Sequence, residues 1–358
     1  MTARAIAFYL PQFHPIKEND VAHGKGFTEW TNVTKSIPLF PGHVQPKLPA
    51  DLGFYDLRLS EVREQQANLA KTYGIEGFCY WHYWLGNGRR LLERPFNEVL
   101  ESGKPDFPFC LGWANHDWSG KGWMGGAQGE DIIQKYPGKR DAEEHFLFLL
   151  KAFKDKRYIR RNDKPVFVIY RPAEIPDCKS YLQFWRTLAE QNGLPGLYII
   201  GDAVPGEPEE LGLDGSLYSG QRHLPSNIWE PSSNWERLHS KSLKKVEYSK
   251  VLRHLVPKGK IKDNLYPVII PNWDTSPRLG DEAMIFYNNN PAFFKIHVSQ
   301  VLDLIESRKV NENLVFIRAW NEWAEGNYLE PDLEYGLGYL EVLKNCLDEF
   351  KSRRNHHE

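Results

Sequence analysis

Residues 60–81, SEVREQQANLAKTYGIEGFCYW, contain the pattern that decides the fold. Ser60 is a suitable helix N-cap, and Glu64 supports the first turn. Gly74 follows the last periodic residue, where glycine commonly ends a helix. An apolar run at Gly77–Trp81 comes almost at once, which predicts a buried strand. The stretch therefore predicts one helix–strand unit of an α/β fold.

The same unit recurs along the chain. The other predicted strands are Ala5–Leu10, Phe109–Trp113, Val166–Tyr170, Leu197–Gly201, Gly215–Tyr218, Val268–Pro271 and Val315–Trp320. The other predicted helices are Asp141–Lys154, Lys179–Asn192, Pro291–Ser307 and Tyr335–Lys351. Most strands are continuously apolar, as expected of parallel strands covered by helices. Eight strands alternating with helical segments predict a single (β/α)8 TIM barrel over residues 1–358.

An open, doubly wound sheet is the alternative fold. Such a sheet would place a glycine-rich phosphate loop after its first strand, but Pro11–Pro15 (PQFHP) follows here. The glycine-rich tract at 123–129 follows no strand directly and is interpreted as a flexible loop. Residues 221–262, between the sixth and seventh strands, are too many for a simple loop. They predict a long surface insertion with a helix near 241–255.

Composition excludes several classes of function. The net charge of −2 and the lack of a basic stripe argue against a nucleic acid partner. No apolar run approaches the ~18 residues needed to cross a bilayer, so no membrane partner is expected. The four cysteines lie far apart, which argues against both a disulfide framework and a zinc site. The N-terminus has no secretory pattern, so we expect a cytoplasmic protein. No cofactor is expected.

Aromatic and polar residues gather where the predicted strands end. In a barrel these ends form one rim, which carries the function. The rim residues are Tyr9, Gln12, His14, Tyr80, Trp81, His82, Trp84, Trp113, Asn115, His116, Trp118, Tyr170, Asp202, Trp273, Trp320, Asn321 and Trp323. Indole rings pack on the apolar face of a sugar, and amide, carboxylate and imidazole groups pair with its hydroxyls. We therefore predict that these residues bind an oligo- or polysaccharide.

Structural roles remain open for individual members of this set. A single tryptophan is more often a core residue than a sugar platform. His82 and His116 could bind substrate or stabilise the fold, and the absence of HxH or HExxH spacing argues against a metal. Asp117 and Asp202 could hold substrate hydroxyls or form salt bridges at the barrel end.

Glu322 and Glu325 follow the eighth predicted strand in the stretch NEWAEG, residues 321–326. Two carboxylates at this spacing past a strand end can point into one pocket. Glycoside cleavage requires such a pair, one as proton donor and one as base or nucleophile. Repulsion between them and burial among indoles would raise one pKa and keep that group protonated near neutrality. The alternative for Glu325 is a carboxylate that favours a helix N-terminus.

Five stretches carry a family resemblance: AFYLPQFHP (7–15), GFTEWTNV (26–33), GIEGFCYWHYW (74–84), WANHDW (113–118) and AWNEWAEG (319–326). They resemble the WbsX-like family, which is similar to glycoside hydrolase family 99, and the resemblance spans residues 4 to 350. It implies a (β/α)8 barrel and adds Glu29 and Trp30 to the expected substrate-binding set. It also implies Glu322 as a base toward the substrate 2-hydroxyl, through an anhydro-sugar, and Glu325 as general acid/base. The first loops depart from family 99, so mannose specificity is not carried over.

Three functions follow, of which a retaining glycoside hydrolase is the first. The second is a glycosyltransferase in surface polysaccharide synthesis, a label also used for the family. Such enzymes usually have an open sheet and often an Asp-x-Asp site, and this chain has no Asp-x-Asp and no cluster of basic residues for a diphosphate. The third is an inactive carbohydrate-binding barrel, which would have no need of two pocket carboxylates. The sequence does not predict the sugar or the oligomeric state.

Overall fold

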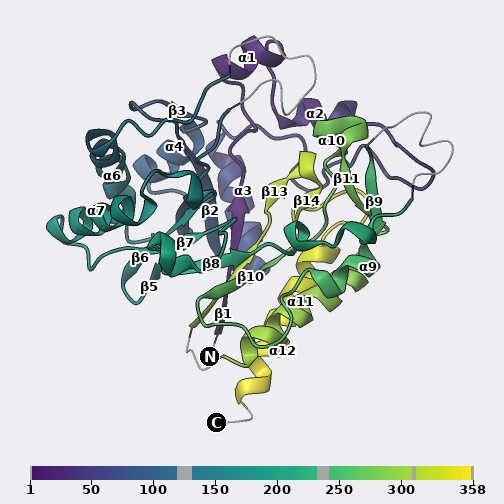
Figure 1. The fold of residues 1–358 in the computed structure, drawn as a ribbon. Coiled ribbons are helices and arrows are strands. Elements are labelled where there is room, and N and C mark those ends of the chain that lie inside the picture. Colours follow the sequence, from purple (N-terminus) through teal and green to yellow (C-terminus); the bar gives the residue numbers. More distant parts are fainter. Residues whose placement is uncertain (1, 119–130, 232–241, 309–311, 356–358) are drawn as a thin grey trace.

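The computed structural model describes residues 2–118, 131–231, 242–308 and 312–355, so the predicted loop at 123–129 lies outside the described part. Its centre is a closed barrel of eight parallel strands (Figure 1). In barrel order these are β1 (Thr2–Tyr9), β2 (Ile75–Trp84), β4 (Phe109–Trp113), β6 (Lys164–Ile169), β7 (Tyr198–Gly201), β8 (Gly215–Tyr218), β10 (Leu265–Ile269) and β12 (Glu312–Ile317). Strand β1 pairs with both β2 and β12, which closes the sheet. The predicted (β/α)8 fold and all eight strands are confirmed.

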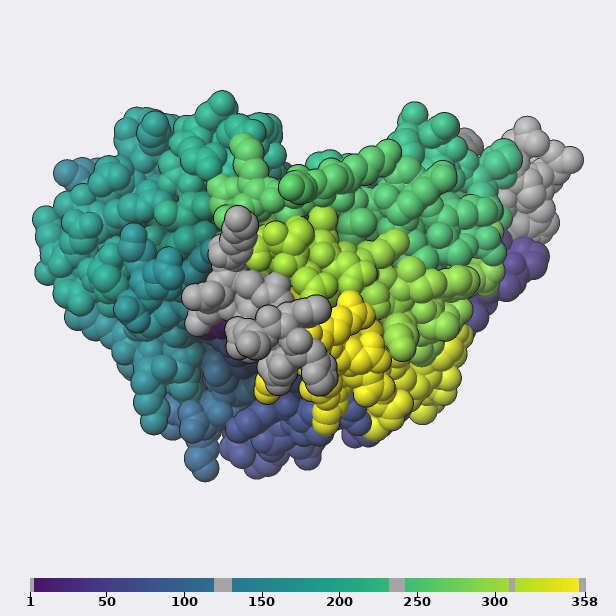
Figure 2. Space-filling view, turned by 90° about the horizontal axis from the view of Figure 1, so that it is seen from below, coloured from purple at the N-terminus to yellow at the C-terminus, as the bar shows by residue number. Residues whose placement is uncertain are grey.

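Helices cover the outside of the barrel. The principal ones are α3 (Ser60–Thr72), α4 (Arg94–Ser102), α6 (Lys139–Phe153), α7 (Cys178–Gln191), α11 (Pro291–Glu306) and α12 (Gly338–Asn355). From below (Figure 2), α12, in yellow, lies beside α11, in light green. Its Lys344 ammonium lies 5.9 Å from the ring centroid of Tyr73, next to α3. The last helix therefore completes the outer layer. No helix in the described part of the chain has the length and apolarity needed to cross a bilayer.

The regular repeat fails between β7 and β8. A single 3-10 turn, η2 (Pro208–Leu211), makes this connection where the (β/α)8 pattern predicts a helix. Only 13 residues separate Gly201 from Gly215, and this is too short for a crossover helix with its two loops. The barrel is therefore less covered at this point.

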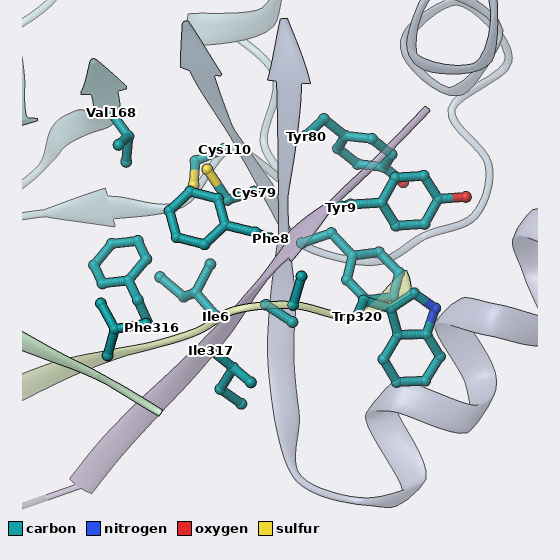
Figure 3. Packing of buried hydrophobic residues seen from close by; sticks show 14 of the residues in the cluster. Ile6, Phe8, Tyr9, Cys79, Tyr80, Cys110, Val168, Phe316, Ile317 and Trp320 are labelled. Atoms are coloured by element: carbon teal, nitrogen blue, oxygen red, sulfur yellow. The ribbon is translucent and has the colours of Figure 1, made fainter. Parts of the chain in front are cut away.

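Strand alternation sorts the barrel residues into two layers (Figure 3). On one side of β1, Phe8 stacks on Trp81 with a centroid distance of 4.7 Å and packs against Phe316 inside the barrel. On the other side, Tyr9 packs against Tyr80 beneath the helices. Successive side chains point to opposite faces because a strand has a period of two. This rule decides which rim residues face the barrel mouth.

A second, two-stranded sheet contains part of the insertion between β8 and β10. Strand β9 (Lys244–Glu247) pairs in parallel with β11 (Met284–Tyr287), and α9 (Tyr248–Val251) follows it. The helix predicted near 241–255 is therefore wrong over its first half. Val246 is fully buried between exposed or half-buried neighbours, which is the alternation of a strand with one buried face.

The buried histidines His82, His145 and His297 are held in the neutral form. His82 and His145 join through their Nε2 atoms at 2.9 Å, and the backbone N–H of Ile270 donates to His297 Nε2. Burial lowers the pKa of His82 to about 3, lowers that of His297 to about 3, and holds that of His145 well below its usual value. Protonation of any of them would place a charge in the core.

These three histidines should lower the stability as the pH falls below about 6.5, and Glu322 acts in the opposite direction, because with its raised pKa it holds a proton in the folded state that the unfolded chain has released. Between this pH and about 3 the unfolded chain binds protons that the folded histidines do not, so each contributes up to about 1.4 kcal/mol of loss per pH unit. Urea unfolding at pH 7, 6 and 5 measures this slope. In His297→Gln the amide oxygen can still accept the Ile270 N–H. Because this variant has one buried histidine fewer, the unfolded chain takes up one proton fewer, and the slope of unfolding free energy against pH should change by up to about 1.4 kcal/mol per pH unit. An unchanged slope in this variant would contradict the assignment.

Candidate active site

Strand β2 extends to the barrel rim, and its alternation decides which side chains reach the mouth. Trp81 and Tyr83 point inward and line the cavity there. Tyr80, His82 and Trp84 point outward and pack against residues of helices α4 and α6. The structure thus brings Trp81 to the site, adds Tyr83, which was not predicted, and leaves the other three beneath the helices. The period of two could have made this distinction from the sequence.

The barrel mouth opens into a cavity of about 580 Å³, a usual size for a ligand site. Six residues of the predicted site line it: Trp81, His116, Tyr170, Trp273, Glu322 and Glu325. Further lining residues include Tyr83, Ala114, Gln221, Arg222, Trp229, Lys244, Met284 and Arg318. Carboxylates, arginines and aromatic rings therefore share one enclosed space.

A tight local structure positions the two glutamates. Asn321 exchanges two hydrogen bonds with the backbone of Leu10, at 2.7 and 3.0 Å, which ties the segment to the end of β1. Glu322 ends β13 (Asn321–Glu322), and Glu325 ends the 3-10 turn η7 (Trp323–Glu325). Gly326 closes the turn with φ 65°, and a Cβ there would lie 2.7 Å from Asp274 Cβ. Only glycine fits this position without strain.

Arg278 joins the two glutamates from behind. This buried residue lies on the short helix α10 (Ser276–Leu279). Its Nη2 donates to Glu322 Oε2 at 2.9 Å, its Nη1 donates to Glu325, and its Nε donates to Glu29 Oε2 at 3.2 Å. The sequence reasoning missed Arg278, because nothing in the stretch SPRL distinguishes it from a surface arginine. Glu29, expected as a substrate contact, instead lies fully buried behind Arg278.

Three carboxylates around one guanidinium carry excess negative charge. Burial raises the pKa of Glu322 to about 8; repulsion from Glu325 and Glu29 adds to this, and Arg278 opposes it. Burial also raises the pKa of Glu29. The site therefore holds a proton at neutral pH, as expected from the sequence, although burial contributes more than repulsion between the pair.

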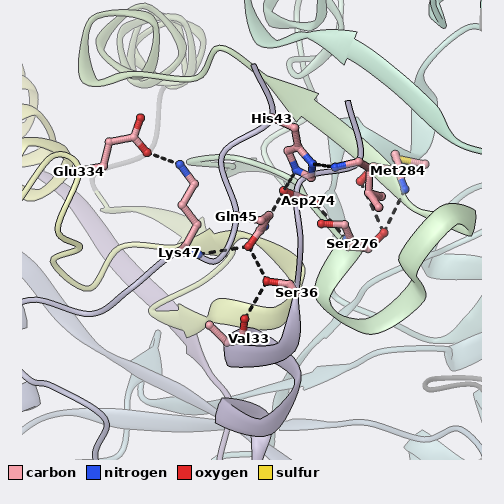
Figure 4. Close-up of polar contacts among 11 residues, drawn as sticks. Val33, Ser36, His43, Gln45, Lys47, Asp274, Ser276, Met284 and Glu334 are labelled. Atoms are coloured by element: carbon pink, nitrogen blue, oxygen red, sulfur yellow. Dashed lines mark hydrogen bonds and ion pairs between the residues drawn. The ribbon is translucent and has the colours of Figure 1, made fainter. Parts of the chain in front are cut away.

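A buried hydrogen-bond network fixes the helix that carries Arg278 (Figure 4). The Asp274 carboxylate accepts hydrogen bonds from His43 Nε2 at 2.8 Å, Gln45 Nε2 at 2.7 Å and the Ser276 N–H at 2.9 Å. Burial would raise the pKa of Asp274, but these hydrogen bonds outweigh it and hold the pKa below its usual value. The start of α10 is therefore anchored to an ionised carboxylate.

A second buried carboxylate anchors the turn between the glutamates. Glu330 accepts hydrogen bonds from Trp323 Nε1 at 2.6 Å, Gln66 Nε2 at 2.7 Å and the Tyr55 hydroxyl at 2.8 Å. Trp323 also stacks on Tyr328 with a centroid distance of 3.8 Å. Its indole is thus directed away from the cavity, and it positions η7.

Most other predicted binding residues lie outside the cavity lining, among protein partners. These are Tyr9, Gln12, His14, Trp30, Trp113, Asn115, Trp118, Asp202, Trp320 and Asn321. For example, the indole N–H of Trp113 donates to Trp84 O at 2.9 Å, and that of Trp30 donates to Tyr55 O at 2.8 Å. These contacts explain Trp113 and Trp30 as structural, and substrate contact by any of the ten residues stays a prediction. Asp117, whose role was left open, accepts a hydrogen bond from the Gln134 N–H.

Asp202 forms salt bridges at the barrel end. Its carboxylate binds Arg222 Nη1 at 2.8 Å and Arg318 Nη2. Both arginines line the cavity, as does Lys244. The prediction that the chain lacks a cluster of basic residues is therefore wrong in three dimensions, because these residues come from separate parts of the chain: a 3-10 turn, the segment after β12, and strand β9. Within the described residues, no group of three potential ligands is arranged to hold a metal ion.

Sequence comparison identifies relatives along nearly the whole chain. The model of the family described as glycosyltransferase WbsX matches residues 5–343. Two proteins of Xanthomonas campestris pv. campestris, from strains ATCC 33913 and B100 and both described as "Uncharacterized protein WxcX", are 35% identical over 97% of this chain. The chain spans about half the length of these curated relatives.

Solved structures with the same fold include a glycoside hydrolase and a glycoside hydrolase-like protein. A GH99 endo-alpha-mannosidase from Bacteroides thetaiotaomicron matches with TM-score 0.58 and 15% identity, covering 98% of each chain. A glycoside hydrolase-like protein matches with TM-score 0.58 and 16% identity, covering 97% of this chain and 94% of its own. At these identities the likeness establishes the shared barrel fold alone.

Proposed function

This chain belongs to the WbsX family, and we propose that within it the chain acts as a retaining glycoside hydrolase on an oligo- or polysaccharide. One observation carries the proposal: Glu322 and Glu325 line the same aromatic-walled cavity and bind the two terminal nitrogens of one guanidinium. A single guanidinium keeps its two carboxylate partners close together. Retaining enzymes need a separation of about 5–5.5 Å, whereas inverting enzymes need about 6.5–9.5 Å.

The proposed reaction assigns one carboxylate to each end of the bond that breaks. Glu322 takes the proton of the 2-hydroxyl, and that oxygen attacks the anomeric carbon. The glycosidic oxygen leaves with the proton of Glu325, which produces a 1,2-anhydro-sugar. Glu325 then takes a proton from water as the water opens this ring, and Glu322 returns its proton to the 2-oxygen. Two inversions at the anomeric carbon give net retention.

A proton must move from Glu322 to Glu325 before the proposed reaction can begin. The pKa of about 8 makes Glu322 the neutral group in the empty site at pH 7, whereas the reaction requires a neutral Glu325. Both carboxylates contact Arg278, and a proton shared in such a pair belongs to the pair rather than to one residue. We propose that a substrate hydroxyl donating to Glu322 stabilises its ionised form and transfers the proton to Glu325.

The shared proton sets the expected pH dependence. Above about pH 8 the pair loses its proton and no general acid remains, so kcat/KM should fall tenfold per pH unit with an apparent pKa near 8. Initial rates between pH 5 and 10 measure this limb. A flat profile up to pH 10 would contradict the need for the retained proton.

A glycosyltransferase is the second candidate, favoured by the family description and by the cationic lining residues Arg222, Arg318 and Lys244. Incubation with a panel of bacterial polysaccharides, and separately with nucleotide sugars and acceptors, distinguishes the two. Release of reducing ends without a nucleotide supports hydrolysis. Sugar transfer that requires a nucleotide donor would overturn the first proposal.

The one-domain organisation over 1–358 and the cytoplasmic location stay predictions, since the relatives are twice as long.

A further inference from the structure

Two arginines form a cationic wall in the cavity that holds the glutamates. Arg222 belongs to the 3-10 turn η3 (Gly220–His223), and Arg318 directly follows β12. Both line the same cavity as Glu322 and Glu325. The Glu325 carboxylate also acts electrostatically on Arg318 and contributes to raising the pKa of the Arg318 guanidinium. The arginine pair, Arg222 and Arg318, therefore faces the space next to the proposed cleavage site.

The arginine pair shares a single salt-bridge partner among the described residues. Buried Asp202 is the only carboxylate that pairs with either side chain among the described residues. The acceptors of Asp202 are in use, because Oδ1 binds Arg222, the Ser219 hydroxyl and the Ala203 N–H, and Oδ2 binds Arg318. Asp202 thus offers one negative charge to two guanidinium groups, and Glu325 acts on Arg318 only at longer range, without a direct ion pair.

Arg222 is the member available to a ligand. Its side chain is 26% exposed, whereas that of Arg318 is 7% exposed. Its guanidinium carbon lies 5.1 Å from the centroid of the Tyr170 ring, another lining residue. Only its Nη1 has an acceptor within the described part of the chain, so Nε–H and Nη2–H are left to bind a group in the cavity. Two such donors match the two oxygens of a carboxylate.

We propose that the arginine pair binds the carboxylate of an acidic sugar unit, which makes the substrate a hexuronate-containing polysaccharide. This inference rests on the proposed function for the cleavage step, but not for binding. The negative group would bind at Arg222, the more exposed member of the pair.

Measuring how acidic oligosaccharides bind to the Glu325→Gln variant tests the proposed carboxylate contact without turnover. The ligands are oligosaccharides of glucuronate, galacturonate and mannuronate, two to four units long, together with the same fragments after chemical reduction of their carboxyls to alcohols. Calorimetry should give at least tenfold tighter binding for one acidic fragment than for its reduced counterpart, with an affinity that falls as salt rises. Equal affinities for every acidic and reduced pair would overturn the proposal.

A pair of arginine variants locates the contact. Arg222→Met should remove most of the preference for the acidic fragment, while Asp202 keeps its bond to Arg318 and the fold is retained. The control is Arg171→Met, because Arg171 also lies over Tyr170, at 5.4 Å, but pairs with Glu174 outside the cavity lining. Equal losses in both variants, or binding of uridine diphosphate in place of the acidic fragments, would contradict the assignment.

The two proposals fail in different ways. Cleavage of neutral polysaccharides with the same kcat/KM as acidic ones would overturn the acidic-sugar inference and leave the hydrolase intact. Tight binding of an acidic fragment that the parent enzyme never cleaves would overturn the hydrolase and leave the inference intact.

Discussion

Glu325→Gln is expected to lower kcat on an unactivated polysaccharide by about 10²–10⁴-fold, because the variant cannot protonate the leaving oxygen. Substrate affinity should change little, since glutamine keeps the size and polarity of the side chain. An aryl glycoside with a good leaving group needs little protonation, so its bond-breaking step should lose much less. This dependence on the leaving group distinguishes a lost acid from a damaged fold.

Two variants control this experiment. Glu322→Gln should lose activity on both kinds of substrate, because the base is needed whatever the leaving group. Glu334→Gln removes a carboxylate outside the cavity lining, paired with Lys47 (Figure 4), and should keep the parent rate. Parent-like turnover by Glu325→Gln, or equal losses of Glu325→Gln on both substrates, would contradict the assigned role.

Arg278→Met is expected to give the largest loss of stability. The change leaves Glu29, Glu322 and Glu325 around a vacated cation site, and breaking a buried charge network in this way costs about 3–5 kcal/mol. The carboxylates can recover part of this loss by taking up protons, so the destabilisation should grow from pH 5 to pH 9. Denaturant unfolding across this range measures it.

Lysine at position 278 provides an informative comparison. Arg278→Lys keeps the charge but cannot span three carboxylates with a planar fork, so stability should return in part while activity stays low. Arg353→Met, which removes an exposed ion pair with Asp303, should leave stability unchanged. If Arg278→Met were as stable as the parent at pH 9, the charge network would not stabilise the site.

Much of the fold could be predicted from local patterns. Continuous apolar strands such as Phe109–Trp113 and helix ends such as Gly74 are decided by short-range chemistry, and the structure places them within a few residues of the predicted bounds. The insertion was harder, because Val246 is buried by pairing with β11, some 40 residues away. No local period reveals such a partner.

The site residues also divide into those that local sequence predicts and those that depend on distant partners. Glu322 and Glu325 could be identified because they are close in sequence and follow a strand. Arg278, Arg222 and Arg318 could not, because their meaning depends on carboxylates brought from other parts of the chain. The excess of predicted aromatic contacts has a simple cause: a barrel rim uses tryptophan for packing as well as for binding, and alternation along a strand decides which applies to Trp81 and Trp84.

The central claim, that Glu322 and Glu325 act as a retaining pair, is tested most directly by the proton NMR spectrum of the first product. The spectrum is recorded within minutes of mixing the parent enzyme with a polysaccharide that it cleaves, before the new reducing end mutarotates. We predict that the new reducing end first appears with the anomeric configuration of the bond that was broken. First appearance of the opposite anomer would contradict the account.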